Sequence, residues 1–154
     1  MRTLDQWFDA YRVSHQHPRN IALHVVCVPA IALSVVGLLA ALPGPAFVEP
    51  WAFMHWGTLG LALVIAYYLR LSVALGLGMA LVGGVFLLGV EALQRLPWPV
   101  WQTSLAIFIV GWIGQFVGHL IEGRRPSFFE DVQFLLIGPA WVLAHLYRRL
   151  GIGF

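Results

Sequence analysis

The stretch that decides the fold is residues 21–42, IALHVVCVPAIALSVVGLLAAL, which contains no Asp, Glu, Lys or Arg. A helix needs about 20 predominantly apolar residues to cross the hydrocarbon core of a bilayer, so this stretch is long enough to span a membrane. Three later segments are also long and apolar, although one of them carries Glu91 near its end. The sequence therefore predicts four spans, at residues 21–42, 51–69, 71–92 and 100–121.

Composition places the chain among integral membrane proteins. It is 60% hydrophobic and 10% charged, whereas about 25% of the residues in a soluble domain are charged. The 154 residues allow a single domain, 1–154, and the single cysteine, Cys27, excludes an internal disulfide. The net charge of +2 is small and the arginines are scattered, which argues against nucleic acid as a partner.

Residues 132–147 form a further apolar stretch, which is short for a span and is broken by Gly138-Pro139. Proline removes a backbone hydrogen-bond donor, so the stretch predicts a kinked or re-entrant fifth segment. The predicted fold class is an all-α polytopic membrane helix bundle, with four spans, this fifth segment and an N-terminal amphipathic helix.

The N-terminal helix is predicted from two local patterns. Residues Thr3-Leu-Asp-Gln6 fit a capping box, in which the first and fourth residues hydrogen-bond each other's backbone. An apolar stripe then recurs at helical spacing, at Leu4, Trp7, Phe8 and Tyr11. Such a helix is expected to lie on the membrane surface.

The arginines predict the orientation, because cytoplasmic loops are enriched in basic residues. All nine basic residues are arginine, and four spans place Arg95 alone on one side and the other eight opposite it. A full fifth span would move Arg148 and Arg149 across, which gives a weaker asymmetry of six against three. Both termini are therefore expected on the cytoplasmic side. The membrane itself is expected to be a bacterial inner membrane.

Two histidine clusters flank the apolar body, and four spans place both clusters at the cytoplasmic face. Imidazoles and carboxylates are costly near a bilayer, so their presence there suggests function. Asn20 and His24 share one helix face, and so do His119 and Glu122, while Pro18 interrupts the helix and lets His15 approach from another direction. The clusters are Tyr11-x3-His15-x4-Asn20-x3-His24 and Gln115-x3-His119-x2-Glu122.

Two or three imidazoles with one carboxylate suit a divalent transition metal, and two histidines with one carboxylate form the usual site of a non-haem iron(II) oxygenase. The alternative is a set of interfacial histidines that bond headgroups or backbone. Haem ligation by His24 and His119 is also open, although it leaves His15 and Glu122 without a role.

The neighbouring residues have two interpretations each. Gln115 and Asn20 either hold a ligand imidazole in place or make helix–helix hydrogen bonds. Arg125, with its neighbour Arg124, either holds a carboxylate or anchors the chain by the positive-inside rule. Gly114-x-x-x-Gly118 predicts close helix packing.

At these residues the chain resembles the small membrane proteins related to the fungal 2-hydroxy fatty acid dioxygenase. The resemblance extends over essentially the whole chain. It rests on the first cluster followed by Pro29, on the second cluster followed by Pro126, and on Gly138-Pro139 in the last apolar stretch.

The resemblance implies an iron(II)-dependent α-oxidation, in which a 2-hydroxy fatty acid reacts with molecular oxygen and becomes one carbon shorter. It implies His15, His24 and His119 as metal ligands, with Glu122 as a fourth ligand or as a base beside the metal. His119 and Glu122 are the catalytic candidates. Relatives often carry an acid after Gly138-Pro139, where this chain has His145, a possible additional site residue.

The substrate-binding candidates are Tyr11, Asn20, Gln115 and Arg125, and the acyl tail is expected to stay among the spans. Membrane lipid is expected as a further partner. The alternative function is a non-catalytic lipid-binding or transport protein with a structural metal site that joins the two ends of the chain.

Overall fold

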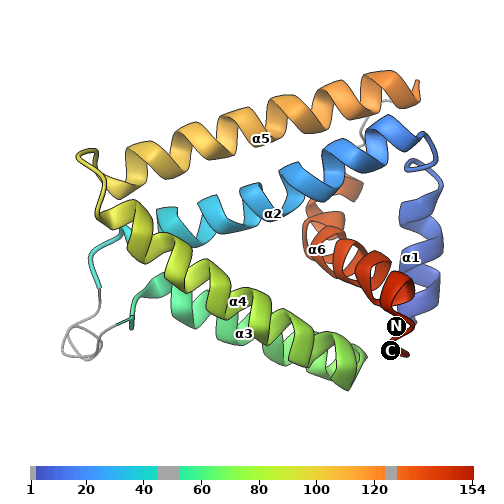
Figure 1. Cartoon of the computed structure of the whole chain (residues 1–154), viewed down its shortest axis with the longest axis horizontal. Helices are drawn as coiled ribbons and strands as arrows, with labels where there is room; N and C mark the ends of the chain where they lie inside the picture. The colour runs from blue at the N-terminus through green and yellow to red at the C-terminus, as the bar shows by residue number, and fades with distance from the viewer. Residues whose placement is uncertain (1–2, 45–52, 124–127) are drawn as a thin grey trace.

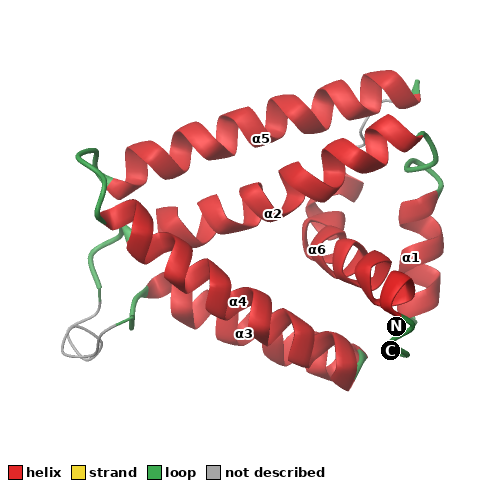
Figure 2. Cartoon of the chain, in the orientation of Figure 1, coloured by secondary structure: helices red, strands yellow, loops and turns green. Residues whose placement is uncertain are grey.

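A computed structural model of the chain describes residues 3–44, 53–123 and 128–154. These residues form six helices and no strand, as Figure 2 shows, so the predicted all-helical fold is confirmed. The helices are α1 (Leu4–Arg12), α2 (Pro18–Ala40), α3 (Trp56–Leu71), α4 (Val73–Gln94), α5 (Val100–Glu122) and α6 (Phe128–Leu150).

Three of the helices, α2, α4 and α5, are long and apolar enough to cross a membrane. The fourth predicted span corresponds to α3, which is apolar but only 16 residues long. Its predicted start at residue 51 lies outside the described residues. The helix itself begins later because Phe53 adopts a left-handed φ of 65° and the His55 side chain then accepts the Thr58 N–H. A fourth full span therefore stays a prediction.

The helices form two pairs that are closed at one end by α1 and α6 (Figure 1). The most extensive contact is between α2 and α5, and the next is between α3 and α4. Close approach of α2 and α5 depends on the predicted glycine pair, because a side chain at Gly114 would collide with Cys27 and one at Gly118 would collide with Asn20. The structure thus confirms that Gly114 and Gly118 allow close packing.

The N-terminal helix has the predicted capping box. The Thr3 hydroxyl accepts the Gln6 N–H at 3.3 Å, and the Gln6 side chain accepts the Thr3 N–H at 2.9 Å. Of the apolar stripe, Phe8 and Tyr11 are buried in a core cluster that includes Trp141 of α6. Leu4 and Trp7, the rest of the stripe, are partly buried against the same cluster, and the location of α1 on a membrane surface stays a prediction.

The last helix, α6, differs from the segment expected at residues 132–147. It is one continuous helix of 23 residues that includes Pro139. The Tyr68 hydroxyl of α3 donates to the Leu136 carbonyl, one turn before that proline. The predicted bounds were those of the apolar run. They were too narrow because the helix extends past that run at both ends, from Phe128 to Leu150.

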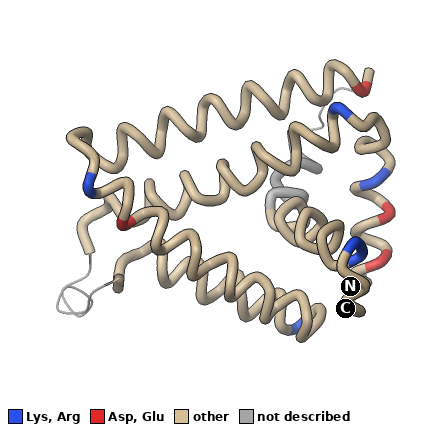
Figure 3. The backbone as a smooth tube through the Cα atoms, in the orientation of Figure 1, with Lys and Arg blue, Asp and Glu red and all other residues tan. Residues whose placement is uncertain are grey.

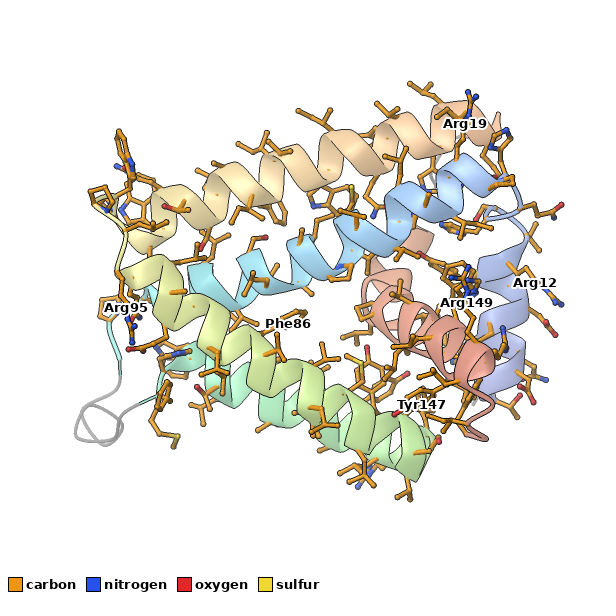
Figure 4. All side chains as sticks on the ribbon, in the orientation of Figure 1. Arg12, Arg19, Phe86, Arg95, Tyr147 and Arg149 are labelled. Carbon is orange, nitrogen blue, oxygen red and sulfur yellow. The ribbon has the colours of Figure 1, made fainter. Side chains whose placement is uncertain are left out.

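Charged residues gather at the ends of the helices, with long uncharged stretches between them (Figure 3). Arg12, Arg19 and Arg149 lie at one end of the bundle and Arg95 lies at the other (Figure 4). The two termini also lie together at the arginine-rich end, where the rings of Phe8 and Phe154 are 6.2 Å apart (Figure 1). This arrangement agrees with both termini on one side of a membrane, while the cytoplasmic assignment stays a prediction.

Candidate metal centre

Three histidines from three different segments meet at the arginine-rich end of the bundle. His15 lies in the connector between α1 and α2, His24 lies two turns into α2, and His119 lies one turn before the end of α5. All three are buried, with exposed fractions of 4%, 1% and 7%. Each offers one ring nitrogen, and these nitrogens lie within 4.8 Å of one another. The fold thus brings His119 next to two histidines that precede it in the sequence by 95 positions or more.

Backbone hydrogen bonds orient two of the three rings. His15 Nδ1 lies 2.7 Å from the Tyr11 carbonyl, and His24 Nδ1 lies 3.0 Å from the Asn20 carbonyl. A carbonyl only accepts hydrogen bonds, so each Nδ1 carries the proton and donates it. Nε2 is then the atom with the lone pair. This is the arrangement that fixes a metal-binding histidine in one tautomer.

The protonation state of His15 supports the same role. Burial of the ring lowers its pKa to about 4, against the opposing effect of the Tyr11 carbonyl. His15 is therefore neutral at pH 7, as a metal ligand must be. Its Nε2 has no hydrogen-bond partner among the described residues. The Tyr11 ring stacks on the imidazole at 3.9 Å and holds it in place.

Glu122, the predicted fourth ligand, makes a different set of contacts. Its carboxylate accepts the backbone N–H groups of Gln16 and His17, at 2.9 and 2.8 Å, and the Asn20 side-chain amide at 3.0 Å. These donors lie at the start of α2, where unpaired N–H groups favour a negative charge. Glu122 therefore joins the end of α5 to the start of α2. A role as ligand or base stays a prediction.

Asn20 links this carboxylate to the histidines. Its side-chain amide donates to Glu122 and to the Ser14 carbonyl at 3.1 Å, while its own carbonyl holds the ring of His24. Asn20 is fully buried. The Asn20 side chain thus makes the hydrogen bond between helices that was one of its two interpretations, while its backbone carbonyl holds the His24 ring. Its proposed contact with substrate stays a prediction.

The close contact between Gly118 and Asn20 gives a first prediction. Gly118→Ala is expected to destabilise the protein by about 1–3 kcal/mol, because the new methyl group overlaps the Asn20 side chain. It is also expected to weaken metal retention through His24. Thermal unfolding and metal content check both effects. Gly84→Ala is the matched control, since a side chain there meets nothing within 4 Å. Identical melting and metal content in the two variants would contradict the link.

The residues present fit a transition metal. Nitrogen ligands lie about 2 Å from such an ion, so the three rings need only a small closing movement to share one. The buried, unpartnered Nε2 of His15 is also the kind of atom that a bound ion would satisfy. Imidazole suits iron, copper, zinc and nickel, so the donor set alone names the class of metal and not the element.

A cavity of about 220 Å³ opens beside the three histidines. Gln115 and Trp112 of α5 line it, one turn apart, and their side-chain nitrogens have no hydrogen-bond partner among the described residues. Trp112 was not predicted as a site residue. Its spacing of three residues from Gln115 was the available signal, because that spacing places both on one helix face.

The remaining predicted site residues are Tyr11, His145 and Arg125. Tyr11 lines the cavity and stacks on His15. His145 is outside the histidine group, and its ring stacks on Trp141 at 5.8 Å. Trp141 in turn lies 5.8 Å from His15, a neighbour that sequence patterns did not indicate. Arg125 lies outside the described residues.

Comparison with known proteins identifies the family of the chain. The 2-hydroxy-palmitic acid dioxygenase MPO1 of Saccharomyces cerevisiae is 27% identical over 143 residues, which cover 92% of this chain and 78% of the yeast protein. No solved structure matches the chain. The family described as 2-hydroxy-palmitic acid dioxygenase Mpo1-like matches residues 1–150. The chain therefore belongs to the Mpo1-like family, as its two histidine clusters suggested.

Proposed function

We propose that this chain is an iron(II)-dependent dioxygenase that shortens a 2-hydroxy fatty acid by one carbon. The observation that carries the proposal is the group of three buried imidazoles at one end of an apolar cavity. The family relationship supplies the reaction class, since the yeast relative is a 2-hydroxy-palmitic acid dioxygenase. The yeast relative is fungal, so it does not support the bacterial inner membrane that was expected from the sequence.

The reaction balances without any further reductant. Cleavage of the bond between C1 and C2 converts the 2-hydroxy acid and one dioxygen into the shortened acid, carbon dioxide and water. C2 loses three electrons and C1 loses one, and the four together reduce one dioxygen to the oxidation level of water. A redox-active ion is needed for this, which favours iron over zinc.

Each neighbouring side chain has an assigned task. His15, His24 and His119 hold the metal, and iron(II), when bound, supplies the redox chemistry that activates dioxygen. Gln115 and Trp112 donate hydrogen bonds to an oxygen of the substrate, because unpartnered N–H groups in a buried site favour a polar ligand. These two donors fix the orientation of the substrate head.

Glu122 and Asn20 act as positioning residues in this proposal. Glu122 holds the start of α2, and Asn20 holds the ring of His24. Tyr11 keeps the His15 ring in place by stacking and by its carbonyl. The burial of all three imidazoles keeps bulk water from the reacting oxygen.

Oxygen uptake tests the proposal. The purified protein, loaded with iron(II), is given 2-hydroxyhexadecanoic acid, and oxygen consumption and the acid products are followed under air, under argon and with a chelator. The expected result is pentadecanoic acid formed under air and in the absence of chelator only. Turnover under argon would contradict a dioxygenase.

The second candidate is a lipid-binding protein whose metal only joins its two ends. The observation that favours it is that the three histidines come from three separate segments, as they would in a structural site. It predicts bound metal and bound fatty acid with no product under any of these conditions.

A further inference from the structure

The cavity beside the histidines extends far beyond the space that a carboxylate and a hydroxyl need. On α2 its lining residues run from His24 to Leu39. These positions differ by 15 residues, so at about 1.5 Å per residue the cavity follows roughly 22 Å of the helix. On α3 the lining runs from Tyr68 back to Gly57, the second residue of that helix, which lies next to the end of α2. The cavity thus reaches from the histidines almost to the opposite end of the bundle.

The two ends of the cavity differ in chemistry. The histidines and the unpartnered nitrogens of Gln115 and Trp112 lie at one end. Between that end and Leu39 the walls are aliphatic and aromatic, and no Asp, Glu, Lys or Arg is among the described lining residues. Phe86 of α4 lies in the space between α2 and α4 (Figure 4). The occupant that fits is a single amphiphile with an oxygen-bearing head and a long, unbranched apolar tail.

We infer that this cavity holds the acyl tail of the substrate, and that its far end, at Leu39, Gly57 and Gly60, sets the longest chain that binds. The inference rests on the proposed function for the position of the head, and it adds the position of the tail and the residues that determine chain length. A tail that enters beside the histidines extends along α2 until it meets this end.

Gly60 is the position that tests the far end of the cavity. It lines the cavity, and a β-carbon there would lie 3.4 Å from Leu39 Cδ1, which is an ordinary contact. A leucine at Gly60 is therefore expected to be accommodated and to fill the last part of the cavity. Gly57 is unsuitable because a β-carbon there would lie 2.6 Å from the Val36 carbonyl oxygen.

The first experiment measures chain length without turnover. Metal-free protein in lipid nanodiscs is titrated with unhydroxylated fatty acids, from decanoic to eicosanoic acid. In Gly60→Leu the longest acids are expected to lose affinity, by about fourfold for each methylene that no longer fits, while the short acids bind as before. Gly84→Leu is the matched control, because a β-carbon there meets nothing within 4 Å. A uniform loss across all lengths, or no change, would contradict the inference.

The second experiment locates the tail directly. Two photoactivatable fatty acids, with a diazirine near the carboxylate or at the far end, are crosslinked to the metal-free protein. The first is expected to label residues near Trp112 and Phe116, and the second to label Leu39 or Leu61. Equal labelling of Leu81, which is 76% exposed on the outer face of α4, would mean that the acids only dissolve in the surrounding lipid. That outcome would overturn the tail site.

These outcomes are separate from those of the proposed function. Binding and crosslinking need neither iron nor oxygen, so a protein that places the tail as expected but forms no product would contradict the dioxygenase and leave the tail site standing. If the protein turns over 2-hydroxy acids but Gly60→Leu leaves its chain-length preference unchanged, the tail site is contradicted and the dioxygenase stands.

Discussion

Replacing His24 or His119 by alanine is expected to abolish the retention of iron by the purified protein. Each substitution removes one of the three imidazoles that the structure brings together among the described residues. Loss of a partner that merely supports a metal ligand typically lowers affinity about 10- to 100-fold, and loss of a ligand itself is expected to exceed that. Metal content after dialysis, measured by mass spectrometry, gives the result directly.

The controls are the two histidines whose side chains cap helices. His17 accepts the Arg19 N–H at the start of α2, and His55 accepts the Thr58 N–H at the start of α3. His17→Asn and His55→Asn keep a capping acceptor and are expected to retain iron. Equal iron content in all four variants would remove the proposed metal site.

Removing the 2-hydroxyl from the substrate is expected to lower turnover on the order of 10⁴-fold. A site built to bind a substrate oxygen discriminates by about this factor against an analogue that lacks it, because its own polar groups are left unpaired. Hexadecanoic acid is therefore expected to bind through its tail and to remain uncleaved. Its 3-hydroxy derivative, in which the two oxygen-bearing carbons are no longer adjacent, is expected to react far more slowly than the 2-hydroxy acid.

The measurement compares the three acids at equal chain length, with binding and product formation followed separately. Gln115→Leu tests the same point from the side of the protein. It removes an unpartnered donor from the cavity wall and is expected to reduce the preference for the 2-hydroxy acid. Equal turnover of hydroxylated and plain acids would contradict the proposed reaction.

The apolar segments could be located from sequence because hydrophobic runs and helix ends leave direct signals. Gly123 ends α5 with a left-handed φ of 72°, a conformation that glycine adopts readily and that makes it a recognisable helix-end signal in a sequence. The start of α3 was misplaced because Phe53 gives no sequence sign of its left-handed conformation. The length of α6 was underestimated because the helix continues past the end of its apolar run.

The convergence of the histidines also followed from sequence, once the span count placed both clusters at one face. The contacts of Glu122 did not, because its partners at Gln16 and His17 are backbone N–H groups that any residue would offer. The cavity also could not be predicted from the sequence. It exists between helices, and the residues that line it, such as Val28 and Leu61, are indistinguishable in sequence from residues that fill a core or face lipid.

The fate of the carboxyl carbon tests the central claim most directly. Iron-loaded protein is given 2-hydroxyhexadecanoic acid labelled with carbon-13 at C1, and oxygen uptake, labelled carbon dioxide and pentadecanoic acid are measured together. The expected result is one dioxygen consumed and one labelled carbon dioxide released for each unlabelled pentadecanoic acid, with none of the three in His119→Ala. Label retained in the acid product, or the same yield from His119→Ala, would contradict the account.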